Sequence, residues 1–424
     1  MPIQVVVGAN WGDEGKGRMV DYLAQDADYV VRFQGGNNAG HTVVNRHGEF
    51  SLHLLPSGVF NPRTVNVLGP GMVIDLQALH EELQGLESKG IKPVIRISER
   101  ATICFPFNRM EDIWEEERLA SRAFGSTRRG IAPAYGDRTV KKAIQLGELL
   151  YPQRFAERLK DLVEWKLLCA RGIYGKSDPF DYEEVSAWIR TFSEGLVPML
   201  CDTGELLESA LQNDKCLLFE AQLGSLRDKD LGIYPFTTSS SVLAGYATAG
   251  GGIPGHRPDR TIAVVKEYAT CVGAGPFITR MQPQDADLLR ESAGEYGATT
   301  GRPREIGHFD GFASRYGVKV QGADQVALTK LDCLSGFKSL KLCTGYRYRG
   351  DLLRYFPINA VLEDVTPEYL ELPGWQEDIG GVRVFEDLPE TAQNYVLAVE
   401  SMLECPISYI SVGKERHAII ANRG

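Results

Sequence analysis

The sequence contains no apolar run near the roughly 18 residues that a membrane-spanning helix needs, and it does not begin with the basic and then apolar segment of a secretion signal. Its eight cysteines include no C-x-x-C pair, which favours buried free thiols in a reducing compartment over disulfides or a cysteine metal site. The formal net charge of −10 disfavours a nucleic-acid-binding surface. We therefore expect a cytoplasmic protein that binds neither membrane nor nucleic acid, and that holds anionic ligands through local clusters of donors.

Short apolar runs alternate with segments of helical periodicity along the 424 residues. Strands are predicted at 3–8, 28–33, 65–68 and 93–97, and apolar residues at helical spacing fill much of 150–200. This alternation favours an α/β fold in which a central, mainly parallel sheet is covered by helices on both faces. The length agrees with two or three domains, or with one large domain that carries insertions.

Three shorter segments have predicted local roles. Asp75 is expected to cap the helix that follows it. The hydroxyl run 237–241 either caps the next helix or lines an anion site. The glycine-rich segment 250–255 is predicted to be a flexible connector.

The segment 10–18 is a glycine-rich loop between a predicted buried strand and a predicted helix. Its glycines allow a tight turn that points backbone N–H groups at a ligand, and Lys16 adds a positive charge, which suits a polyphosphate. The loop is not a standard phosphate-binding loop, because Asn10 and Gly17 replace the first glycine and the hydroxyl residue of that motif. Asp13 is a candidate metal ligand or base; alternatively, Asp13 and Glu14 are a solvated acidic pair in an ordinary turn.

Other loops carry polar groups that suit a ligand. His41 follows Gly40 at the mouth of a predicted strand and is either a hydrogen-bonded structural residue or a catalyst. The loop 124–138 is rich in hydroxyls and arginines, although its arginine pair at 128–129 is also typical of a solvated surface. The loop 294–304 holds two arginines between glycines and a proline, an arrangement that can grip a carboxylate or phosphate.

A more specific signal is the strand ending in T-K-L-D at 329–332. An aspartate at this place can accept hydrogen bonds from both N1–H and the 2-amino group of guanine, which adenine cannot offer. The stem of Lys330 can cover the base. This pattern predicts guanine recognition.

Taken together, these motifs resemble the adenylosuccinate synthetase family, from the first strand to I-S-V-G at 410–413. The resemblance rests on W-G-D-E-G-K-G, G-G-x-N-A-G-H-T, T-x-R-G-I-x-P-A-Y, G-A-T-T-G-R-P-R, T-K-L-D and I-S-V-G, in family order. It implies one large α/β domain over 1–424, with a helical insertion around 145–210, that acts as a homodimer. The implied reaction joins L-aspartate to C6 of IMP, consumes GTP and releases GDP and phosphate, with Mg²⁺ as cofactor.

The resemblance also implies roles for individual residues. Asp13 would take the proton from N1 of the purine and hold Mg²⁺ together with the Gly40 carbonyl, and His41 would stabilise the charge that develops during phosphate transfer. The implied GTP ligands are Gly12, Asp13, Glu14, Gly15, Lys16, Gly17, Gly40, His41, Thr42, Arg304, Lys330, Leu331, Asp332, Ser411, Val412 and Gly413. The implied IMP ligands are Asn38, Thr127, Lys141, Gln222, Thr238 and Arg302, and those for aspartate are Thr299, Thr300, Gly301, Arg302 and Arg304.

The purine side departs from the family pattern. Leu223 stands where the family has a glutamine that contacts the purine 6-oxygen, so Gln222 would have to replace it through a shifted loop. Lys141 replaces an arginine that crosses the dimer interface to the IMP phosphate, Cys271 replaces another arginine, and Arg280 replaces a glutamate. Two alternatives therefore remain: a paralogue that uses another 6-oxopurine acceptor, and a non-catalytic GTP-binding protein.

Overall fold

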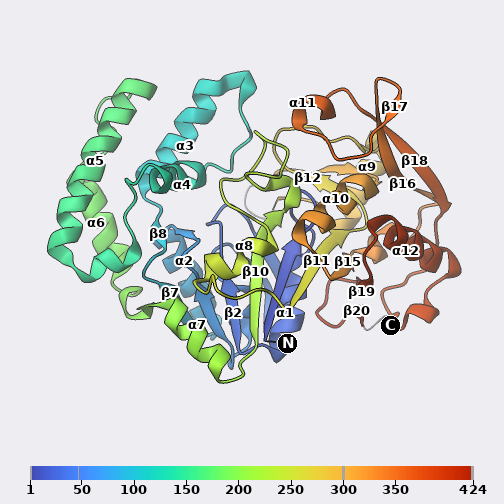
Figure 1. The fold of residues 1–424 in the computed structure, drawn as a ribbon, viewed down its shortest axis with the longest axis horizontal. Coiled ribbons are helices and arrows are strands. Elements are labelled where there is room, and N and C mark those ends of the chain that lie inside the picture. The colour runs from blue at the N-terminus through green and yellow to red at the C-terminus, as the bar shows by residue number, and fades with distance from the viewer. Residues whose placement is uncertain (1, 46, 298–300, 422–424) are drawn as a thin grey trace.

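A computed structural model describes residues 2–45, 47–297 and 301–421, and its centre is a ten-stranded sheet (Figure 1). All neighbouring strands in this sheet are parallel except the edge strand β20, which is antiparallel to β19. The predicted α/β class with a mainly parallel sheet is confirmed. In spatial order the strands are β20 (Ile419–Ala421), β19 (Ile407–Ser411), β15 (Gln325–Thr329), β11 (Arg260–Lys266), β1 (Ile3–Gly8), β10 (Leu217–Gly224), β2 (Tyr29–Arg32), β5 (Val65–Leu68), β7 (Val94–Ser98) and β9 (Leu200–Cys201).

The central strands are apolar because helices cover both faces of the sheet. Val5, Val6 and Val7 of β1 are all fully buried, although consecutive side chains point to opposite faces. The carboxyl ends of the parallel strands lie along one edge of the sheet, where polar loops follow them. The helices around the sheet include α1 (Lys16–Leu23), α2 (Leu76–Glu87), α7 (Thr203–Gln212), α8 (Ala244–Gly251), α9 (Pro283–Ala293) and α10 (Gly311–Gln321).

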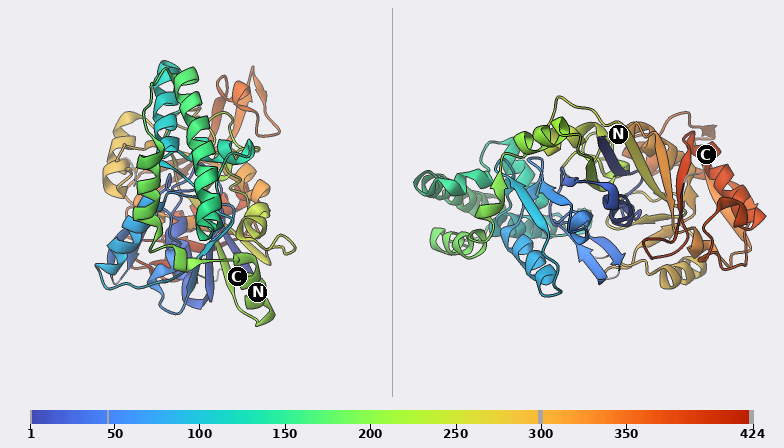
Figure 2. Two further views of the ribbon diagram at one scale, coloured as in Figure 1. Left: turned by 90° about the vertical axis from the view of Figure 1, so that its left-hand side faces the viewer. Right: turned by 90° about the horizontal axis from the view of Figure 1, so that it is seen from below.

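A group of helices stands beside the sheet, on the left in Figure 1 and toward the viewer in the left panel of Figure 2. It consists of α3 (Pro106–Leu119), α4 (Ile131–Thr139), α5 (Pro152–Tyr174) and α6 (Tyr182–Ser193). The predicted apolar stripe of α5 is buried, as at Leu159 and Leu162. Lys166 on the same helix is also buried, 2.6 Å from the carboxylates of both Glu111 and Asp137. The extent of the insertion around 145–210 stays a prediction.

A second sheet, on the right in Figure 1, was not predicted from the sequence. It pairs β16 (Ser339–Tyr348) with β14 (Phe309–Asp310), β17 (Asp351–Leu352) and β18 (Thr366–Pro373), and α11 (Asn359–Leu362) and α12 (Glu390–Leu403) lie near it. Three small pairs complete the strands: β3 (His41–Asn45) with β4 (Gly48–Leu52), β6 (Val73–Ile74) with β8 (Thr102–Ile103), and β12 (Ala269–Cys271) with β13 (Glu305–Gly307).

One local prediction is confirmed, one is wrong and one is narrowed to a single alternative. Asp75 accepts from the N–H of Ala78 and caps α2 as expected. The hydroxyl run does not cap α8, whose first N–H instead donates to Gln321 Oε1 at 2.7 Å, so the alternative of an anion site stays a prediction. Gly250 and Gly251 are not a flexible connector but the buried end of α8, where an added Cβ would lie 2.3 Å from the Phe33 carbonyl and 2.5 Å from the Phe219 ring. Glycine therefore allows close packing there.

The eight cysteines all lie in the described part of the chain and all are free, as predicted, but only four of them are buried: Cys104, Cys271, Cys343 and Cys405. Within 2–45, 47–297 and 301–421, no helix combines the length and the apolar composition that crossing a bilayer requires.

Candidate active site

The glycine-rich loop joins β1 to α1 at the carboxyl edge of the sheet. Gly12 and Gly15 have φ angles of +111° and +95°, which glycine adopts without strain. Asp13 also has a positive φ of 60°, a conformation that is uncommon for other residues and is concentrated at functional sites. Its side chain is one-third exposed, whereas Glu14 and Lys16 are buried.

Glu14 stabilises this loop from within. Its Oε1 accepts from the N–H groups of Asn10 (3.1 Å) and Gly12 (2.8 Å), and its Oε2 lies 2.6 Å from Lys16 Nζ. The alternative of a solvated acidic pair is wrong for Glu14. Its carboxylate is buried because it accepts hydrogen bonds from the N–H groups of the turn itself.

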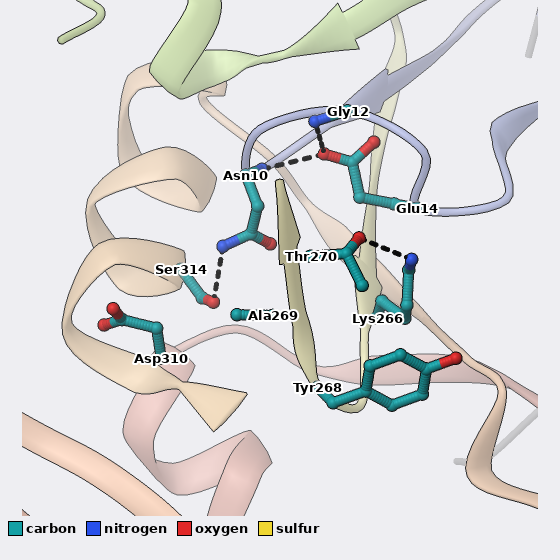
Figure 3. Close-up of a pocket in the computed structure, with 9 residues that line it drawn as sticks. All are labelled: Asn10, Gly12, Glu14, Lys266, Tyr268, Ala269, Thr270, Asp310 and Ser314. Carbon is teal, nitrogen blue, oxygen red and sulfur yellow. Dashed lines mark hydrogen bonds between the residues drawn. The ribbon is translucent and has the colours of Figure 1, made fainter. Parts of the chain in front are cut away.

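A polar cavity of about 10 Å³, the space of one water molecule, lies beneath the loop (Figure 3). Asn10 Nδ2 donates to Ser314 Oγ at 2.8 Å, and Lys266 Nζ donates to Thr270 Oγ1 at 2.7 Å. The cavity is too small for a substrate. Its lining connects the loop to β11, β12 and α10.

His41 opens β3 and lies against α1. Its Nδ1 forms a short hydrogen bond with Glu220 of β10, whose other oxygen accepts from the N–H of Ser57 at 2.7 Å. Burial lowers the pKa of His41, although the charge of Glu220 opposes this effect. Nε2 is buried and has no hydrogen-bond partner among the described residues, so the ring is fixed at one nitrogen and can contact a ligand at the other. Glu220 was not predicted as a site residue. The one signal in the sequence is its position as a charged residue within an apolar strand.

The predicted guanine-binding segment follows β15, beside the end of β19. Lys330 has a φ of +67°, and its N–H donates to Ser411 Oγ at 3.3 Å. Asp332 Oδ1 is buried with no hydrogen-bond partner within the described chain. Leu331 and Val412 are fully buried, so only their backbone groups are suited to bind a nucleotide.

A cavity of about 650 Å³ opens above the carboxyl edge of the sheet. It is large enough for a nucleotide. The predicted site residues that line it come from segments far apart in the sequence: Gly12, Asp13, Asn38, Gly40, Thr127, Thr238 and Arg302. The described segments 330–332 and 411–413 do not line it and lie farther along the same edge.

Gln222 and Leu223 point in different directions. Between Val6 and Gly8 of β1, β10 shifts its register, since these residues pair with Glu220 and Gly224. Leu223 adopts a φ of +58° and lines the large cavity. Gln222 is fully buried, and its Nε2 donates to the Gly36 carbonyl at 2.7 Å. The register shift is therefore present, but it does not bring Gln222 into the cavity.

Lys141 lies outside the large cavity. It borders a separate surface cavity of about 260 Å³ that also contains Arg138, Glu148 and Arg158. Within one described chain, Lys141 is thus not brought together with Asn38 or the other predicted acceptor ligands. Thr42 is exposed and does not line the large cavity either.

Two acidic residues of α3 hold the loop that carries Thr127. Glu116 accepts from the N–H groups of Phe124, Gly125 and Ser126, each at 3.0 Å. Asp112 accepts from Ser126 Oγ at 2.6 Å and from the N–H of Gly130 at 2.9 Å. The sequence analysis did not single out either carboxylate, because a charged helix surface normally indicates solvent exposure.

The two arginines of the predicted aspartate-binding loop differ in their surroundings. Arg302 lines the cavity, and its guanidinium donates to the Ser126 carbonyl at 3.4 Å. Arg304 is nearly buried, with Nε 3.0 Å from Asp13 Oδ2 and a second nitrogen 2.6 Å from Glu295. Gly301 is exposed, and Thr299 and Thr300 lie outside the described residues.

Arg227 supplies a positive charge beside the altered position 271. Its guanidinium donates to the Val272 carbonyl at 2.9 Å and contacts Cys271 Sγ at 3.0 Å. The hydrogen bond to Val272 links Arg227 to another residue that lines the cavity. Arg280, the other altered position, pairs with Glu305 on the surface.

The residues also fit a magnesium ion. Asp13 and Gly40 line the same cavity and offer a carboxylate and a carbonyl, the hard oxygen ligands that Mg²⁺ prefers. The described residues contain no cluster of three or more histidine, cysteine or acidic side chains that could hold a metal ion.

Comparison with known proteins agrees with this geometry. The family model described as adenylosuccinate synthetase matches residues 5–420. The chain is 48% identical over 421 residues to adenylosuccinate synthetase 2 of Pseudoalteromonas translucida, covering 99% of this chain and 100% of that protein. It is 44% identical over 422 residues to adenylosuccinate synthetase of Pelotomaculum thermopropionicum, covering 99% of each.

A solved structure of fully ligated adenylosuccinate synthetase from Plasmodium falciparum has the same fold. The TM-score is 0.93, the identity is 34%, and the match covers 100% of both chains. The loops described above thus belong to a fold that is shared over its whole length. The chain is a member of the adenylosuccinate synthetase family of ligases, which form carbon–nitrogen bonds.

Proposed function

We propose that this ligase joins L-aspartate to C6 of IMP at the expense of GTP, with the residues around the 650 Å³ cavity performing the chemistry. The observation that carries the proposal is the convergence of Asp13, Asn38, Thr238 and Arg302 on one cavity wall. The carbonyl oxygen on C6 of IMP is a poor leaving group until it is phosphorylated. The site must therefore combine a base, a cation and phosphate-binding donors.

In the proposed mechanism, Asp13 takes the N1 proton of IMP, and the resulting 6-oxyanion attacks the γ-phosphorus of GTP. The O6–P bond forms as the bond to GDP breaks. The aspartate amine then attacks C6, and phosphate leaves with the C6 oxygen. His41 would donate from Nε2 to the phosphoryl oxygens once the bound phosphates raise the pKa that burial lowers, and Glu220 would then balance the imidazolium charge.

Asp13 and the Gly40 carbonyl would hold Mg²⁺, which supplies charge neutralisation at the phosphates. The loop from Gly12 to Gly17 and the segment from Gly40 to Thr42 would hold the triphosphate. The segments 330–332 and 411–413 would hold the guanosine. The buried, unpartnered oxygen of Asp332 supports this assignment, because a guanine amino group provides the missing donor.

Aspartate is assigned to Gly301, Arg302 and Arg304, together with Thr299 and Thr300 outside the described residues. IMP is assigned to Asn38, Thr127, Thr238 and Arg302, with Lys141 acting from a second subunit. The position of Lys141 on the surface supports a homodimer. So does the exposed apolar side of α5, where Leu168 and Ile173 are 56% and 59% exposed. A cytoplasmic location remains part of the proposal.

Leu223 favours a second candidate, a ligase of the same type that uses another 6-oxopurine nucleotide. An apolar side chain faces the cavity where an amide would stabilise the 6-oxyanion, and Gln222 does not replace it. An acceptor with a different substituent near this wall would be affected least by the missing amide.

The test is phosphate release from GTP and Mg²⁺ with IMP and aspartate together and with each omitted in turn. Release that needs both substrates, with formation of adenylosuccinate, supports IMP as the acceptor. GTP binding with no IMP-dependent release refutes IMP, and a series of 6-oxopurine nucleotides then identifies the acceptor.

A further inference from the structure

Glu295, a residue with no role in the mechanism above, lies at the centre of a buried polar cluster. Its carboxylate lies 2.6 Å from Lys330 Nζ, 2.6 Å from an Arg304 nitrogen and 3.1 Å from Lys266 Nζ. Tyr268 also donates its hydroxyl to it at 2.5 Å. The Glu295 side chain is completely buried, so these four side chains take the place of water around it.

The cluster contains more positive than negative charge. Burial alone would raise the pKa of Glu295, but the charges of Lys266, Lys330 and Arg304 hold it well below its usual value. Three cations thus share the carboxylate of Glu295. Asp13 adds a second negative charge nearby, because it forms an ion pair with Arg304. A buried carboxylate with several cationic partners fixes their side chains firmly, because withdrawal of any one leaves an uncompensated charge.

The partners of Glu295 extend to different parts of the proposed site. Arg304 contacts Asp13 and belongs to the aspartate-binding loop. Lys330 belongs to the guanine-binding segment, with its N–H on Ser411. The carboxylate of Glu295 therefore connects two proposed substrate sites. The aspartate-binding loop reaches the large cavity through Arg302, whereas the guanine-binding segment 330–332 does not line that cavity.

We propose that Glu295 is a positioning residue that holds Arg304 and Lys330 simultaneously and thereby couples GTP binding to aspartate binding. The proposal rests on the proposed function. Ordering of Lys330 over the base fixes Glu295, and Glu295 then holds Arg304 in the geometry that receives aspartate. The coupling is reciprocal, so aspartate tightens GTP binding by the same factor.

The experiment compares Glu295→Gln with Glu305→Gln in the full chain. Both variants remove one negative charge from the same segment, but Glu305 pairs with Arg280 at the surface, where it is half exposed. For Glu295→Gln we expect the KM for aspartate and the KM for GTP each to rise at least tenfold, with kcat changed less than fivefold. We also expect the aspartate KM to become independent of GTP concentration. Glu305→Gln should match the wild type in all three quantities.

Constants for Glu295→Gln that equal those of Glu305→Gln would overturn the proposal, whatever the change in Tm. If Glu295→Gln does not fold, Lys330→Met provides the same test, because Glu295 keeps Lys266 and Arg304 as partners. At saturating GTP this variant should raise the aspartate KM at least threefold, and an unchanged value refutes the coupling. Absence of aspartate-dependent phosphate release by the wild type would instead refute the proposed function.

Discussion

At the ends of β1, β15 and β19 the site is held by buried polar contacts, whereas the acceptor side is formed by loops that are anchored from outside the main sheet. Glu14 and Glu295 are completely enclosed by donors on the first side. On the second side, Glu116 and Asp112 of α3 hold the loop 124–130 by hydrogen bonds, and the apolar side chain of Leu223 lines the cavity. The nucleotide side is therefore fixed by buried contacts within the sheet edge, whereas the acceptor side depends on a loop held by α3 and on an apolar side chain.

The largest expected effect separates chemistry from binding on the nucleotide side. Asp13→Asn should lower kcat by about 10³-fold or more, because it removes the base, while GTP affinity changes little. Steady-state turnover and calorimetric GTP titration measure the two quantities. Asp26→Asn, a change at an exposed carboxylate, is the matched control. Turnover of Asp13→Asn near the wild-type value would rule out the proposed base.

The second prediction tests the departure on the acceptor side. Leu223→Gln should raise IMP-dependent kcat by up to about 100-fold, because one well-placed donor to a developing oxyanion contributes about 10²- to 10³-fold and an introduced amide is not fully preorganised. Leu223→Met keeps an apolar wall and should change little. If both variants have the same kcat with IMP, Leu223 does not determine which purine nucleotide the enzyme accepts.

The third prediction concerns the contact between α1 and His41. A Cβ at Gly17 would lie 2.9 Å from His41 Cβ and 3.2 Å from Ser57 Oγ. Gly17→Ala should therefore displace His41, lower kcat about tenfold and reduce the free energy of unfolding by about 1–3 kcal/mol. Gly136 of α4 has no atom within 4 Å of its added Cβ, so Gly136→Ala should increase stability by about 0.5–1 kcal/mol. Urea unfolding and turnover assays distinguish the pair.

The last expected effect depends on pH, leaves turnover unchanged and concerns the scaffold beneath the loop. Burial raises the pKa of Asp310 from 3.8 to about 6. The folded protein therefore binds this proton more tightly than the unfolded chain, and stability should fall as pH rises through this interval. The expected loss is about 3 kcal/mol, and it stays constant at higher pH.

Asp310→Asn removes this titration but keeps the oxygen that caps Ala313. The free energy of unfolding of the variant relative to the wild type should thus increase between pH 4 and pH 7. Asp364→Asn, at an exposed carboxylate, should show no such trend. A parallel pH dependence for Asp310→Asn and the wild type would contradict the assignment.

The sequence predicted what short-range patterns determine. The apolar run of β1, the cap at Asp75 and the helical stripe of α5 follow from local periodicity, and the structure confirms them. The family motifs indicated which loops meet at the sheet edge. The assignment of individual ligands stays a prediction.

Long-range packing decided what could not be predicted. Gly251 is a glycine because Phe219 of β10 approaches it, and no local pattern distinguishes that reason from flexibility. Glu295 has a role only because Lys266, Lys330 and Arg304 converge on it from three separate segments. The second sheet around β16 lacked a signal of its own, because its strands alternate only partly between buried and exposed residues.

The ion pair between Glu14 and Lys16 has a consequence for the catalytic cycle. In the proposed GTP complex, Lys16 exchanges a carboxylate partner for a phosphate, so the electrostatic gain is the difference between two ion pairs rather than the whole of one. Once the γ-phosphate has been transferred, Lys16 can form its ion pair with Glu14 again. In that proposed complex Glu14 would compete with the phosphates of GDP for Lys16, so the residence time of GDP, as well as its affinity, would depend on this carboxylate.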